Sequence, residues 1–298
     1  MVACGRVVSL KEFFHKPQIE THYYSIIDKF TDIAIVDSYR QTPKNRFVLL
    51  GASNLTLSLR LTIHLMQQRF GGPSEILAAL GHGRAYGAFT QMLWRGLPSI
   101  TNCDLWRRLD SIEIHPTYAV LTDIGNDILY GLPPQQVLQT LEWCIDQLQK
   151  HSAKIVVTNL PMTSIKSLSE WRYIFFRNIF YPSCQLSRDE TINRAQVVHH
   201  GLVDMAARRH FKLYEQKPDW FGLDGIHVSY WRRKAYYQDM LYQFSDLDKK
   251  SGAIGNKQEF LLTWQRRPEF AYKTVLGRTS YCQQPSGQLT DGSLVCKC

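Results

Sequence analysis

The sequence predicts an α/β protein built as a three-layer α/β/α sandwich. Five short apolar runs of β type are separated by segments of helical length. Runs that consist almost entirely of Val, Ile and Leu are expected to be buried on both faces of a parallel sheet. Strands that alternate with helices favour helices on both faces and right-handed crossovers. The predicted strands are Phe47–Leu50, Glu75–Leu80, Tyr118–Ile124, Ile155–Leu160 and Phe211–Tyr214.

Three helices are expected around the later strands, at Gln135–Lys150, Arg188–Arg209 and Ser229–Phe244. The first of them follows Pro133-Pro134, and proline is a common start signal for a helix. We expect the helices to pack against the sheet through their apolar positions.

The segment Leu55–Leu65 allows two interpretations. Its strict alternation of apolar and polar residues is typical of a strand. On a helix, however, Leu55, Leu59 and Ile63 form one apolar ridge, and leucine has a strong helix propensity. We favour the helix; a strand would change the topology of the first half of the domain.

The composition, 44% hydrophobic and 20% charged over 298 residues, is typical of a soluble globular protein. No apolar run reaches the roughly 18 residues of a membrane span. Residues Met1–Arg6 lack the start of a signal peptide, and the seven scattered cysteines do not resemble a disulfide framework. These features predict a cytoplasmic protein.

Three regions are expected: an N-terminal extension at 1–45, the main domain at 46–246, and a basic, partly disordered C-terminal extension at 247–298. The net charge is +9, and residues 249–298 hold eight basic and three acidic side chains, a net charge of +5. From Tyr281 onward Gln, Pro, Ser and Gly predominate, which favours poor order. Since no arginine–aromatic pattern for stacking bases is present, nucleic acid is not an expected partner.

Two motifs contain the parts of a nucleophile and its base. Gly51-Ala52-Ser53-Asn54 follows the first strand, and a serine hydroxyl becomes a nucleophile when a base accepts its proton. Two residues separate Asp224 from His227, so in a turn the carboxylate can reach Nδ1 and leave Nε2 to act as that base. Each motif also has a structural interpretation: Ser53 or Asn54 caps the helix after the first motif, and Ser229 caps the helix after the second.

Two further motifs offer hydrogen-bond donors. The glycines of Gly81–Gly87 expose backbone N–H groups that can serve an oxyanion. Within that loop, Arg84 binds either an acidic substrate group or solvent and a salt-bridge partner. After the third strand, the Asn126 amide either donates to an oxyanion or caps the next element.

In the order serine, glycine, asparagine and Asp-x-x-His, the four motifs resemble the SGNH (GDSL-type) hydrolase superfamily over roughly residues 46–243. The resemblance implies a flavodoxin-like sandwich with about five parallel strands. It also implies ester hydrolysis through an acyl-serine intermediate.

By position, the resemblance implies that Ser53 is the nucleophile, His227 the general base and Asp224 the residue that orients it. The oxyanion hole would comprise the backbone N–H groups of Ser53 and Gly83 and the side chain of Asn126. Gly81 and Gly87 compete with Gly83 for this role.

Two positions depart from the family pattern. Ala52 stands where the family has an aspartate that supports the turn, so we expect weaker support of the turn but retained activity. Ile124 stands where the family has a glycine, so the loop that carries Asn126 is expected to differ.

The sequence therefore predicts a serine esterase or acylesterase acting on a small-molecule or glycan ester, without a metal or other cofactor. An acyltransferase with the same triad and a non-catalytic binding protein of this fold are the alternatives, and neither the substrate groups nor the oligomeric state are predicted. His199-His200 and Cys296-Lys297-Cys298 lack the spacing of a structural zinc site. We interpret the aromatic residues between Trp171 and Tyr181 as helix packing, with a pocket wall as the alternative.

Overall fold

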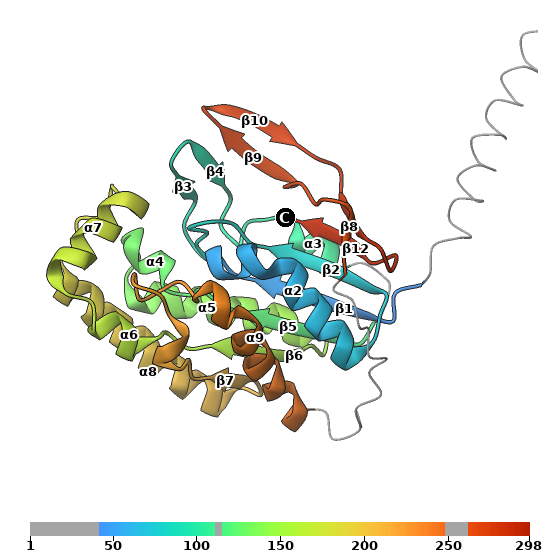
Figure 1. Ribbon diagram of the computed structural model, residues 1–298, viewed down its shortest axis with the longest axis horizontal. Helices are drawn as coiled ribbons and strands as arrows, with labels where there is room; N and C mark the ends of the chain where they lie inside the picture. Colours follow the sequence, from blue (N-terminus) through green and yellow to red (C-terminus); the bar gives the residue numbers. More distant parts are fainter. Residues whose placement is uncertain (1–41, 111–114, 248–261) are drawn as a thin grey trace, which may run out of the picture. The chain divides into compact units, whose positions relative to one another are not determined.

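A mostly parallel sheet forms the middle of the fold in the computed structural model, which describes residues 42–110, 115–247 and 262–298. Counted along the chain, the five predicted strands take the order 2-1-3-4-5, which is the order of flavodoxin-like sheets. The predicted fold class is therefore confirmed. The sheet runs β7 (Lys212–Tyr214), β6 (Lys154–Thr158), β5 (Thr117–Leu121), β1 (Asn45–Leu50), β2 (Ser74–Ala79), β12 (Leu294–Lys297), β11 (Gly287–Leu289) and β8 (Trp264–Arg266) (Figure 1).

Helices cover both faces of this sheet and create two separate cores (Figure 1). The side chains of β1 alternate between them: Val48 and Leu50 point to one core, Phe47 and Leu49 to the other. One face is covered by α2 (Ser53–Phe70) and α9 (Arg233–Tyr242), and the other by α3 (Leu105–Leu109), α5 (Pro134–Lys150) and α8 (Arg188–Arg208).

The remaining helical elements are short, and most of them lie in the loops that follow the strands. They are α4 (Asn126–Leu129), α6 (Met162–Lys166), α7 (Glu170–Phe180), and the 3-10 turns η1 (Pro218–Trp220), η2 (Tyr230–Arg232) and η3 (Gln243–Leu247). None of the helices in the described part of the chain is long and apolar enough to cross a membrane.

The ambiguous segment is a helix, as favoured, within the 18-residue α2. Leu55, Leu59 and Ile63 are buried against the sheet, whereas Leu57 is 48% exposed. Burial therefore does not follow the apolar–polar alternation of the sequence. It follows the ridge of residues four apart, which packs against the sheet.

The C-terminal region differs from the prediction of a partly disordered extension. Residues 262–298 include five strands, and β12 pairs in parallel with β2 inside the main sheet. Val295 of β12 is completely buried. Pairing with β12 covers an edge of β2 that would otherwise be open, which explains why this segment is ordered despite its polar composition. The predicted extension at 1–45 lies outside the described residues, apart from residues 42–45.

A second, smaller sheet was not predicted. Two hairpins form it in the order β10 (Arg278–Tyr281), β9 (Tyr272–Val275), β4 (Arg95–Leu97) and β3 (Thr90–Met92), all antiparallel. One hairpin follows β2 and the other belongs to the C-terminal region, yet they lie side by side (Figure 1). Strands this short leave little periodic signal in a sequence.

We predict that Val295→Ala lowers the free energy of unfolding by about 2 kcal/mol, because it removes two buried methyl groups and leaves a cavity. Val203→Ala is a matched control on α8, where the side chain is 43% exposed, and it should change stability by less than about 0.5 kcal/mol. Chemical denaturation of both variants measures the difference. Equal stability of the two variants would contradict the place of β12 in the sheet.

Candidate active site

Ser53 lies directly after β1, as the first residue of α2, at the edge of the sheet where the strands end. Its Oγ is 2.7 Å from Nε2 of His227, which belongs to the loop between β7 and α9. Nδ1 of His227 is in turn 2.6 Å from Oδ2 of Asp224. The structure therefore brings together the three residues that the sequence analysis proposed as nucleophile, base and orienting carboxylate.

The loop around Asp224 holds its carboxylate in place. Oδ1 accepts hydrogen bonds from the backbone N–H groups of Ile226, at 3.1 Å, and His227, at 2.9 Å. Gly225 has a φ of 72°, a backbone conformation that residues other than glycine rarely adopt. With one carboxylate oxygen bound to the turn, the other faces Nδ1, which directs Nε2 towards Ser53.

The pair His227 and Asp224 shifts both pKa values in the direction that suits a base. Burial lowers the pKa of His227, but the hydrogen bond and negative charge of Asp224 outweigh it, so the pKa lies above its ordinary value of 6.5. Burial raises the pKa of Asp224, but contacts with His227 outweigh it and hold the pKa below its ordinary value of 3.8. Asp224 is therefore an anion that stabilises a protonated His227.

Asn54 connects the turn at Ser53 to the loop that carries His227. Its Nδ2 donates to the carbonyl oxygen of Ile226 at 2.9 Å, and its Oδ1 accepts from the N–H of Val228 at 2.8 Å. These two bonds bracket His227 on both sides along the chain. Asn54 therefore fixes the distance between Ser53 and His227 and does not cap α2.

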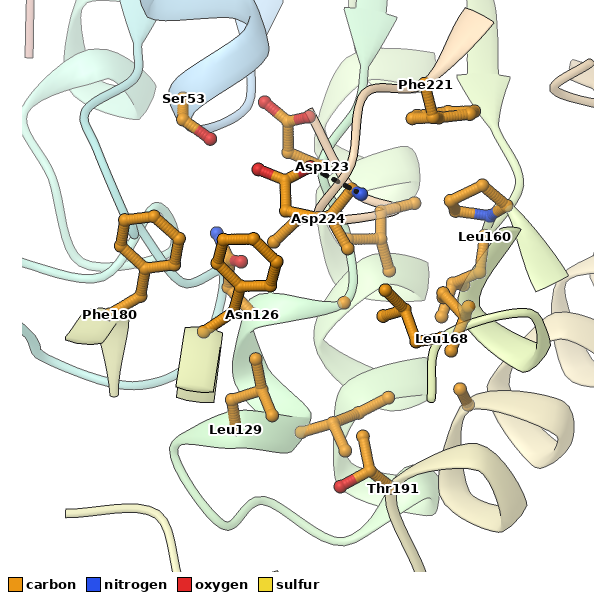
Figure 2. A pocket seen from close by; sticks show the side chains of 18 of the residues that line it. Ser53, Asp123, Asn126, Leu129, Leu160, Leu168, Phe180, Thr191, Phe221 and Asp224 are labelled. Carbon is orange, nitrogen blue, oxygen red and sulfur yellow. Dashed lines mark hydrogen bonds between the residues drawn. The ribbon is translucent and has the colours of Figure 1, made fainter. Parts of the chain in front are cut away.

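Asp123, at the end of the neighbouring strand β5, supports the turn that Ala52 was expected to leave weak. Its Oδ2 accepts from the N–H of Ala52 at 2.8 Å and of Leu55 at 3.4 Å. Its Oδ1 accepts from Nδ2 of Asn54 at 2.7 Å, the contact drawn in Figure 2. No role was predicted for Asp123 from the sequence. Its place at the end of a predicted strand, on the edge that holds Ser53, was the available signal.

The candidate oxyanion donors Gly83 and Asn126 line the same cavity as Ser53. Asn126 is held at both ends: Nδ2 donates to the carbonyl oxygen of Arg84 at 2.9 Å, and Oδ1 accepts from Tyr181 at 2.6 Å. The competing glycines are less suitable. The N–H of Gly87 donates to Asp127 at 2.7 Å, and Gly81 lines neither of the two cavities at the site.

Arg84 has neither of the two roles considered for it. The side chain is fully buried, and its guanidinium donates to the carbonyl oxygens of Leu80, Pro98 and Cys298. It ties the glycine loop to the end of β12. Arg84 is therefore a structural residue of the loop that carries Gly83.

Two cavities flank Ser53. The first, of about 120 Å³, is mostly apolar and extends from Ser53 past Asn126 towards Leu129, Leu160 and Leu168 (Figure 2). The second, of about 440 Å³, lies on the side of His227 and the hairpin β3–β4.

Helix α7 and the residue after it, Tyr181, separate the two cavities, because Phe180 and Tyr181 line both. Phe176 also lines the first cavity, so the aromatic segment forms a pocket wall, the alternative that the sequence analysis did not favour.

No group of three or more His, Cys, Asp or Glu side chains is placed to hold a metal ion within the described residues.

Together, the fold and the site define an α/β protein with a serine–histidine–aspartate chain of hydrogen bonds at the carboxyl edge of its sheet. No family model and no curated protein matches the sequence.

Several solved structures are similar to this chain. They include the psychrotrophic esterase EstA from Pseudoalteromonas sp., with 12% identity over 69% of this chain and 100% of that chain and a TM-score of 0.42. A carbohydrate acetylesterase family member from Sinorhizobium meliloti has 12% identity over 68% and 98% of the two chains and a TM-score of 0.46. A member of the lipolytic protein G-D-S-L family from Veillonella parvula has 13% identity over 69% and 98%, with a TM-score of 0.41. The fold assignment rests on the strand order and layers, not on these likenesses.

We predict that Asp224→Asn lowers the pKa of His227, because burial continues to disfavour the imidazolium while the negative charge that raises the pKa is gone. An NMR titration of the imidazole nitrogens measures the shift. Asp110→Asn is the matched control, since Asp110 accepts from His151, 2.9 Å away, and has no contact with His227. An unchanged pKa in Asp224→Asn would contradict the electrostatic role of the carboxylate.

Asp123→Asn should lower the free energy of unfolding by about 1–3 kcal/mol, because buried N–H groups around Ser53 lose their carboxylate acceptor. The exposed Asp204 on α8 provides the control Asp204→Asn, which should stay within about 0.5 kcal/mol of the wild type. Both values come from denaturant unfolding. If the two variants are equally stable, the hydrogen bonds of Asp123 do not support the turn.

Proposed function

We propose that the protein is a serine hydrolase that cleaves an ester through an acyl-serine intermediate. The hydrogen-bonded chain from Ser53 through His227 to Asp224, with distances of 2.7 and 2.6 Å, is the observation that carries this proposal. A serine in this arrangement has the base that it needs to become a nucleophile.

In the first half of the reaction, neutral His227 accepts the proton of Ser53 as Oγ attacks the ester carbonyl carbon. Asp224 stabilises the imidazolium that forms. The tetrahedral intermediate then collapses, His227 donates its proton to the leaving alcohol, and the acyl group stays on Ser53. In the second half, His227 activates a water molecule in the same way, and the acid is released.

The oxyanion is stabilised by the backbone N–H of Ser53, the N–H of Gly83 and Nδ2 of Asn126. Removal of one such donor reduces kcat by about 10²- to 10³-fold in comparable enzymes. The first donor lies at the N-terminal end of α2, where the helix dipole also favours negative charge. The contacts of Asn126 with Arg84 and Tyr181 orient its amide before the substrate binds.

Two alternatives use the same fold. An acyltransferase shares every step up to the acyl-serine and differs only in the acceptor, an alcohol in place of water. A non-catalytic binding protein has no need of a histidine whose two ring nitrogens contact a serine and a carboxylate. The intact chain of hydrogen bonds therefore favours an enzyme.

We expect a fluorophosphonate probe to label Ser53, because the probe reacts with serine hydroxyls that a base activates. Ser53→Ala and His227→Ala should abolish labelling, whereas Ser280→Ala, on the exposed strand β10, should leave it unchanged. Gel fluorescence and peptide mass spectrometry measure the extent and the site. A folded wild-type protein that remains unlabelled would overturn the proposed function.

A further inference from the structure

The larger cavity beside Ser53 has the cation Arg95 in its lining, and no Asp or Glu. Arg95 comes from β4 and is half-buried, with its guanidinium carbon 5.3 Å from the centre of the Phe270 ring. Lys297, from β12, contacts the same ring, with Nζ 3.9 Å from its centre. Two cations therefore share one aromatic ring next to the cavity.

These cations lack anionic partners. In the described parts of the chain, neither Arg95 nor Lys297 forms an ion pair with a carboxylate, whereas the neighbouring Lys273 lies 3.9 Å from Glu269. Burial lowers the pKa of Arg95. Burial and the neighbouring cations Arg95, Lys273 and Arg84 together lower the pKa of Lys297 to about 8. The protein thus holds positive charges close together without compensation.

Such an arrangement is unfavourable unless an anion completes it. A partly buried cation loses hydration, and only a counter-ion or well-placed acceptors restore that loss. The contact with the Phe270 ring offsets only part of this loss. A ligand with a negative charge would be stabilised by both cations at once.

The side of the cavity also indicates which part of an ester enters it. His227 lines the larger cavity and not the apolar one. Since His227 donates its proton to the leaving alcohol in the proposed reaction, the alcohol part lies on that side. The apolar cavity on the other side of Ser53 then takes the acyl group.

We propose that the larger cavity binds a negatively charged group, carboxylate or phosphate, on the alcohol part of the ester substrate. Arg95 makes the direct contact, since its planar guanidinium matches either group with paired hydrogen bonds. Lys297 adds a second positive charge close to Arg95. This inference rests on the proposed function and names its substrate class: an ester of an apolar acid with an anionic alcohol.

The C-terminal region contributes Lys297 to this pair of cations and supports the hairpin of Arg95. β12 runs parallel to β2, so Lys297 reaches the same edge of the sheet as the loop at Gly81–Gly83. β9 pairs with β4 and supports the hairpin that carries Arg95. The C-terminal region therefore places one of its basic residues, Lys297, beside the ring that Arg95 contacts at the cavity.

The test compares three esters: phenyl butyrate, 4-carboxyphenyl butyrate and 4-(phosphonooxy)phenyl butyrate. For each we measure kcat/KM, corrected for the rate of spontaneous hydrolysis, and the dissociation constant for the Ser53→Ala variant by calorimetry. We expect the wild type to prefer at least one anionic ester over phenyl butyrate by about 10-fold or more. Comparison of the carboxylate ester with the phosphate ester shows which anion is favoured. Arg95→Gln should reduce that preference about 10-fold, and Arg95→Lys should retain part of it.

Arg278→Gln is the matched control, because it removes one positive charge from the exposed strand β10, away from the cavity lining, and should preserve the preference. The anion site would be overturned by equal affinity and kcat/KM for neutral and anionic esters, or by a preference that Arg95→Gln leaves intact. In either case, hydrolysis of phenyl butyrate would still uphold the proposed function. Tight binding of the anionic esters that depends on Arg95, with no hydrolysis of any ester, would uphold the site and overturn the proposed function.

Discussion

The hydrogen bonds of Asn54 are the interaction on which the site depends. This one side chain contacts Asp123 at the end of β5 and the backbone on both sides of His227. It thereby joins three segments that are far apart in the sequence: the turn after β1, the turn after β5 and the loop before α9. A displacement of about 1 Å between a nucleophile and its base can cost about 10²-fold in rate, so this junction sets the geometry that any chemistry at Ser53 requires.

The parallel sheet makes that junction possible. Because β1, β2 and β5 are neighbours and run in the same direction, the residues after each strand meet at one edge. Asp123 supports the turn at Ser53 from the neighbouring strand, and Asp127 accepts from the N–H groups of Tyr86 and Gly87 in the loop after β2. Two carboxylates on one segment therefore brace the loops after β1 and β2.

The sequence was sufficient for the five central strands, which are short continuous apolar runs, and for the main helices. It was also sufficient for Ser53, Asp224 and His227, because their motifs lie next to these elements and occur in an order that resembles a known family. It was insufficient where an interaction joins distant segments. Nothing near Arg84 indicates that it binds the end of β12, and the role of Asp123 depends on a contact with Ala52 across two strands. The C-terminal strands were missed because three- or four-residue strands between polar turns resemble a disordered tail until their partner β2 is known.

The C-terminal region changes how the charge of the chain is understood. In the sequence, its excess of basic residues belongs to a tail, and a solvated tail interacts with anions only weakly and without geometry. In the structure, Lys297 is largely shielded from water beside Phe270, and the strand before it is fixed in the sheet. Charge that is held in a fixed place at reduced dielectric acts more strongly and on fewer ligands than the same charge in solvent. The region that the composition marks as accessory thus holds a fixed positive charge at the ring beside Arg95, which lines the larger cavity.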